Sequence, residues 1–92
     1  NIGIEQYNLE QQEKTQILSY LLSNYNDGRR KTFFCVAVNL LDLSELQEAM
    51  KQIQSNDELA LLPFKAQCLY VVEVFRKIAE RRNIKLKLIK KK

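Results

Sequence analysis

The chain has 92 residues, of which 46% are hydrophobic and 28% are charged, and its formal net charge is +4. This composition is typical of a globular protein and excludes a disordered chain, and the length suits one small domain with a single modest core. Two Gly and one Pro are too few turn residues for an all-β fold, so helices are favoured. We predict a single domain over residues 1–92; because the sequence begins at Asn1 without Met, a piece of a longer chain is an alternative.

The first predicted helix runs from Asn8 to about Tyr25. Asn8 is a favourable N-cap residue, and Gln11 follows at the capping-box position. Apolar residues then repeat at helical spacing, and Gly28 is the expected C-terminal stop. The seven residues before Asn8 are too few to assign firmly, although the alternation of Ile2 and Ile4 fits a short edge strand.

The segment KTFFCVAVNLL, residues 31–41, is apolar on every side and fits two structures. As a helix it would be the buried rod of a bundle, whereas its Phe and Val residues also suit a strand. Periodicity does not separate the two, but the sequence has no other strong strand that could pair with it. We favour the helix.

Two further helices are predicted more clearly. Asp42 and Glu45 form a capping-box pattern in front of LSELQEAMKQIQ, residues 43–54, which would bury Leu46, Met50 and Ile53. A longer helix should start near Pro63 and end near Arg82. Its inner face is expected to hold Phe64, Cys68, Val71, Val72, Phe75, Ile78 and Ala79.

The end of the chain, IKLKLIKKK, alternates apolar residues with Lys and indicates a short extended segment. The predicted fold is therefore mainly α, a small four-helix domain with a short C-terminal extended segment. The alternative is an α+β fold in which residues 32–40 and 84–89 are strands.

Catalysis and cofactor binding have little support in the sequence. It contains no His, no GxSxG turn and no Gly-rich phosphate loop. Cys35 and Cys68 lie in apolar runs without a CxxC partner, so we expect buried, reduced thiols, no metal site and a cytoplasmic protein. No apolar run is long enough to cross a membrane. We expect no enzyme activity and no cofactor.

One candidate anion site precedes the apolar segment. Arg29, Arg30, Lys31 and Thr32 would stand at a helix N-terminus, where the helix dipole disfavours positive charge and a bound anion would remove the conflict. The alternatives are a solvated turn, which we narrowly favour, or pairing of the cations with Asp27 or with acidic groups of another helix.

Charge is distributed unevenly along the chain, and this gives a second candidate surface. Residues 1–60 hold five Lys and Arg against nine Asp and Glu, whereas residues 61–92 hold ten against two. The basic end can attract a polyanion or an acidic protein surface, and its candidate contacts are Arg76, Lys77, Arg81, Arg82, Lys85 and Lys87. The alternative is an ordinary solubilising surface.

We expect a non-catalytic protein-interaction or regulatory module that binds another protein or itself, since the acidic and basic halves are complementary and apolar residues are plentiful. The alternative is nucleic-acid binding through the basic C-terminal third. No aromatic nucleic-acid-binding motif accompanies those cations.

Overall fold

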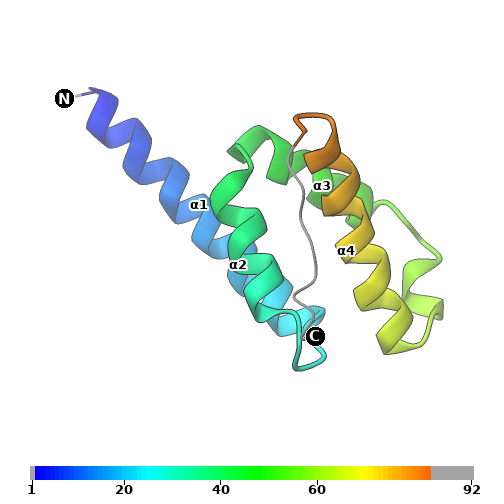
Figure 1. The fold of residues 1–92 in the computed structure, drawn as a ribbon. Coiled ribbons are helices and arrows are strands. Elements are labelled where there is room, and N and C mark those ends of the chain that lie inside the picture. Colours follow the sequence, from blue (N-terminus) through cyan, green and yellow to red (C-terminus); the bar gives the residue numbers. More distant parts are fainter. Residues whose placement is uncertain (1, 84–92) are drawn as a thin grey trace, which may run out of the picture.

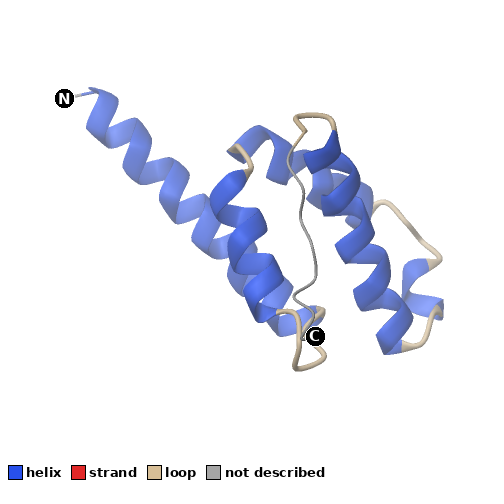
Figure 2. Cartoon of the chain, viewed as in Figure 1, coloured by secondary structure: helices blue, strands red, loops and turns tan. Residues whose placement is uncertain are grey.

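A computed structural model describes residues 2–83, and all regular structure in this range is helical (Figure 1 and Figure 2). Helix α1 spans Ile2–Asn24, α2 spans Lys31–Leu40, α3 spans Leu43–Gln54 and α4 spans Phe64–Glu80; a short 3-10 turn, η1, spans Leu59–Leu61. The predicted mainly α fold is confirmed, and a strand at residues 32–40 is wrong. The predicted extended segment at residues 84–89 lies outside the described residues.

Helix α1 begins six residues earlier than the sequence indicated. Asn8 is not an N-cap but lies inside the helix, and residues 2–7 are helical and not an edge strand. A strand would need a neighbouring strand to pair with, and residues 2–83 contain none. Once the packed part of α1 is formed, each further residue adds a hydrogen bond at little cost, so the helix continues toward the N-terminus.

The turn between α1 and α2 is held by polar side chains. The side-chain oxygen of Asn26 accepts the backbone N–H groups of Gly28 at 3.0 Å and Arg30 at 3.3 Å. Asp27 likewise accepts the N–H of Arg29 at 3.1 Å. Gly28 has a φ of 95°, a left-handed conformation that glycine adopts without strain. This turn lets α2 fold back against α1.

The predicted capping box is confirmed at the start of α3. Asp42 is the N-cap residue, and Glu45 occupies the third helical position. The carboxylate of Glu45 accepts the backbone N–H of Asp42 at 2.8 Å. Leu41 and Leu46 on either side are fully buried, as a hydrophobic staple requires. Only two residues therefore separate α2 from α3.

The helices share one core. Helix α1 packs against α2 and α3, and α3 packs against α4. The rings of Phe34 on α2 and Phe75 on α4 meet edge to face with centroids 6.2 Å apart. The largest fully buried side chains come from all four helices and the turn after α2: Phe34, Phe75, Leu21, Leu41, Leu46, Ile53, Ile78, Val71 and Cys68.

Helix α4 follows the prediction except at its ends. Pro63 is the N-cap residue, the helix ends at Glu80, and Asn83 has a φ of 59° as expected for a residue that leaves a helix in the left-handed conformation. The predicted inner face is buried apart from Phe64, which is 48% exposed. Helical side chains lean toward the N-terminus, so a residue in the first turn points past the core.

Helix α1 is much longer than its neighbour. Its 23 residues measure about 35 Å and the 10 residues of α2 about 15 Å. Since the two run antiparallel, the N-terminal part of α1 projects beyond the bundle (Figure 1). We call residues 3–12 of α1 the arm. Every residue of the arm is exposed except the half-buried Glu10.

Candidate interaction surface

The arm carries large apolar side chains that no described residue covers. Ile4 is 60% exposed, Tyr7 is 62% exposed and Leu9 is 56% exposed. Ile4 and Tyr7 lie one helical turn apart, on the face that further along α1 holds the buried Leu21 and Tyr25. The core-facing stripe of α1 therefore continues onto the arm, where the bundle has ended.

Leu9 belongs to a different face of the arm. Glu5 lies four residues before it and Glu13 four residues after it, so the three side chains follow one another along the helix. The same face continues through Gln16 to Tyr20. This second stripe leads directly into a groove.

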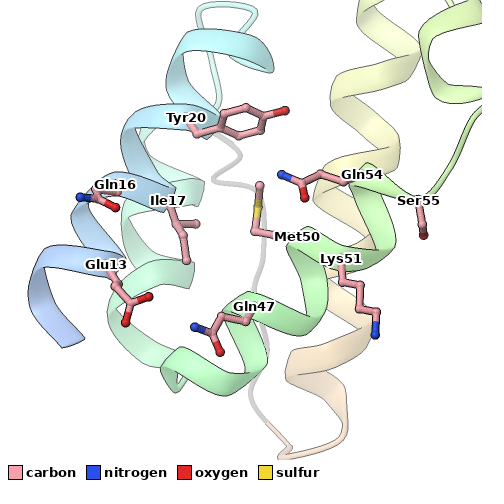
Figure 3. A pocket seen from close by; sticks show the side chains of 9 residues that line it. All are labelled: Glu13, Gln16, Ile17, Tyr20, Gln47, Met50, Lys51, Gln54 and Ser55. Atoms are coloured by element: carbon pink, nitrogen blue, oxygen red, sulfur yellow. The ribbon is translucent and has the colours of Figure 1, made fainter. Parts of the chain in front are cut away.

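The groove lies between α1 and α3 and is shown in Figure 3. It has a volume of about 540 Å³, within the range of ligand pockets. The side chains of Ile17, Tyr20 and Met50 give it an apolar floor, and Figure 3 shows Tyr20 and Met50 pointing into the space between the two helices. The remaining lining is polar: Glu13, Gln16, Gln47, Lys51, Gln54 and Ser55.

Among the described residues, the charged groups along this surface form no ion pair with one another or with the rest of the bundle. Within residues 2–83, none of Glu5, Glu13 and Lys51 forms a salt bridge. Near the groove, the pKa of Tyr25 is raised by burial and by the neighbouring Tyr20, whose ring meets it edge to face at 6.2 Å. The groove thus offers an apolar floor, and the charges at its rim are exposed and have no ion-pair partner within residues 2–83.

The four residues of the candidate anion site differ in their exposure to solvent. Arg29, Lys31 and Thr32 are exposed, whereas Arg30 is only 7% exposed and stands at the N-cap position of α2. The Nε of Arg30 lies 3.5 Å from the carboxylate of Asp27 and has no hydrogen-bond partner among the described residues. The four residues therefore do not converge on one point outside the protein. Pairing of Arg30 with Asp27 corresponds to one of the alternatives drawn from the sequence.

Cys68 lies in the electrostatic field of this ion pair. Burial raises the pKa of the Cys68 thiol, the charge of Asp27 raises it further, and the charge of Arg30 partly offsets both. Cys35 is half-buried, and the two cysteines are free thiols. A buried thiol with a raised pKa is a poor nucleophile, so Cys68 serves packing.

The basic C-terminal candidates are largely engaged by the protein itself. Arg81 donates to Glu48 of α3 at 2.6 Å, and Arg82 donates to Glu45 at 2.7 Å. Arg76 lies 3.4 Å from Glu73, one turn earlier in α4. Lys77 is exposed. Lys85 and Lys87 lie outside the described residues.

The net positive charge of the chain is concentrated in its last nine residues. Residues 2–83 hold ten Lys and Arg against eleven Asp and Glu, a net charge of −1, and the five lysines of residues 84–92 account for the remaining +5. Most of the net positive charge of the chain therefore lies in residues 84–92.

Residues 2–83 contain no cluster of side chains that could hold a metal ion and no helix that is long and apolar enough to cross a membrane. No protein-family model, curated protein or solved structure matches the chain.

Sequence reasoning missed both the arm and the groove. The signal for the arm was the helical spacing of Ile4 and Tyr7 in line with the later core stripe, but the alternation of Ile2 and Ile4 was interpreted as a strand. No sequence signal could have found the groove, because it depends on how far apart α1 and α3 lie.

Proposed function

We propose that this protein is a non-catalytic interaction module that binds another protein along the arm and the groove. The observation that carries the proposal is the exposure of Ile4, Tyr7 and Leu9 on a helix that extends beyond its own bundle. An unsupported helix of this length is only marginally stable in water, and packing against a partner would supply the missing support. Ile4 and Tyr7 adjoin each other on one face of the arm, Leu9 lies on the face that leads into the groove, and exposed apolar side chains gathered on one element are typical of interaction surfaces.

The test is site-specific photo-crosslinking in cells, with the crosslinker at Gln16 on the groove rim. We expect a discrete crosslinked polypeptide that disappears in a Leu9→Ser chain. Leu61→Ser is the matched control, because Leu61 is 83% exposed on η1, outside the groove. Both changes remove an exposed leucine, so neither should alter the melting temperature.

The identified polypeptide, once purified, should bind the wild-type and Leu61→Ser chains and not the Leu9→Ser chain. A product that forms equally in all three chains, or no product at all, would show that the arm is not a docking element.

A further inference from the structure

The groove has the form that receives a helix. Its floor consists of Ile17, Tyr20 and Met50, and it lies between two helices whose outer rows form its walls. The amide side chains of Gln16, Gln47 and Gln54 line the rim and can bond polar groups without adding charge. Apolar side chains spaced at i, i+3 or i+4, and i+7 on a partner helix fit such a floor.

The arm adds charge at one end of this groove. Leu9 extends the apolar floor by about one turn beyond Glu13, and the exposed Glu5 lies about one turn further out. Neither carboxylate is paired within residues 2–83. Over residues 2–28, Lys14 is the only cation against four acidic residues. A segment that lies along the groove and the arm therefore meets an acidic surface at the arm.

We propose that the groove and the arm bind an amphipathic helix of another protein, with Lys or Arg residues at the end that lies over the arm. This inference rests on the proposed function and specifies its partner. The apolar residues of the helix fill the floor at Ile17 and Met50, and its cations reach Glu13 and Glu5. Such charge complementarity fixes the direction of the partner in the groove and steers its approach.

A second copy of the chain is the less suitable occupant. Two arms paired by a two-fold axis through their Leu9 faces would bring Glu5 and Glu13 of both copies together, and like charges oppose that contact. In the described residues, the cation-bearing helix α4 buries its apolar face in its own core, so it offers no free basic amphipathic surface.

The probe is a synthetic 15-residue amphipathic helix with leucines at helical spacing and three lysines at one end. The control peptide has the same sequence with glutamates in place of the lysines. Each is titrated into the full 92-residue chain, and amide chemical shifts locate the contact. We expect the basic peptide to change the amide chemical shifts of Ile17, Tyr20 and Met50 and the acidic peptide to change none of these shifts.

Charge variants then test the orientation. Glu5→Gln with Glu13→Gln should weaken binding of the basic peptide about fivefold, since exposed ion pairs are individually weak. Glu73→Gln with Glu80→Gln removes the same charge from α4, away from the groove, and should leave binding unchanged. Equal loss in both double variants, or equal binding of both peptides, would overturn the inference, because attraction would then be non-specific.

Failure of this inference is distinguishable from failure of the proposed function. If neither peptide binds but the Leu9-dependent crosslink at Gln16 persists, the partner chemistry is wrong and the interaction surface stands. If sedimentation shows a dimer that Leu9→Ser dissociates, the occupant is a second copy and the inference is overturned.

Discussion

Arg82 at the end of α4 donates a hydrogen bond to Glu45 of α3 at 2.7 Å, and the same carboxylate oxygen accepts the backbone N–H of Asp42 at 2.8 Å. One side chain therefore both caps α3 and connects it to α4. Burial alone would raise the pKa of Glu45, but the hydrogen bonds from Asp42 and Arg82 and the charges of Arg82 and Arg81 lower it below its ordinary value.

We expect acid to weaken the fold through Glu45. Because the pKa of this carboxyl is lower in the folded state, the unfolded state takes up the proton first as the pH falls. The stabilisation is complete above the ordinary pKa of 4.5 and is lost as the pH falls through the folded value. Glu45→Gln keeps a side-chain oxygen for the N–H of Asp42 but has no carboxylate to protonate. In urea unfolding at several pH values, its free energy of unfolding should therefore decrease less with falling pH than that of the wild type. Equal decreases in the two chains would contradict this prediction.

The ion pair of Arg30 with Asp27 gives a second prediction. Asp27→Asn leaves the buried guanidinium without its counter-charge, so the free energy of unfolding should fall by about 3 kcal/mol. Arg29→Gln is the control, since Arg29 is exposed and its loss should change stability by less than about 0.5 kcal/mol. Denaturant titration of both variants measures the difference. Equal stabilities would mean that the ion pair of Arg30 with Asp27 does not stabilise the fold.

The same variants test the candidate anion site. Millimolar sulfate should change the melting temperatures of the wild-type and Arg29→Gln chains equally, because Arg30 is buried beside Asp27 and is not available to an anion at the start of α2. A rise in melting temperature with sulfate that Arg29→Gln abolishes would restore the anion site.

Gly28 should be sensitive to substitution for a backbone reason alone. A methyl group at its Cα would contact nothing within 4 Å, but the φ of 95° is unfavourable for any residue with a Cβ. Gly28→Ala should therefore lower stability by about 1 kcal/mol, and Gly28→Asn by less, because Asn adopts this conformation more readily. If the alanine variant is as stable as the wild type in thermal unfolding, the turn has an alternative conformation.

Polyanion binding can be judged from the contacts of Arg81 and Arg82. Their carboxylate partners hold them, so Arg81→Gln with Arg82→Gln should bind a single-stranded oligonucleotide much like the wild type. Glu48→Gln frees Arg81, whereas in a Glu45→Gln chain Arg82 still lies 3.6 Å from the carboxylate of Asp42. Combining the two changes should therefore steepen the slope of log K against log salt by about 0.7, the contribution of one added phosphate contact. An unchanged slope would show that Arg81 faces no bound strand.

Local patterns determined most of the secondary structure. The Asp42 and Glu45 capping box is a sequence signal with a mechanism confined to a few residues, and it was predicted correctly. Helix α4 begins at Phe64, one residue after the predicted start at Pro63. Residues 32–40 were ambiguous because an apolar run fits a buried helix or a strand equally well. The absence of a neighbouring strand in residues 2–83 decides in favour of the helix.

The functional surfaces were decided by tertiary structure. Arg81 and Glu48 are 33 residues apart, and only the packing of α4 on α3 brings them together, so composition alone overstated the free positive charge of α4. In the same way, Ile4 and Tyr7 are exposed because α2 ends before it reaches them, which depends on the relative lengths of the two helices. By itself the sequence determined which residues form helices and which of their faces are apolar, since both depend on near neighbours in the chain. Contacts between distant segments, which only the folded chain brings together, decide which charges stay unpaired. They also decide where the apolar face of a helix extends beyond the core.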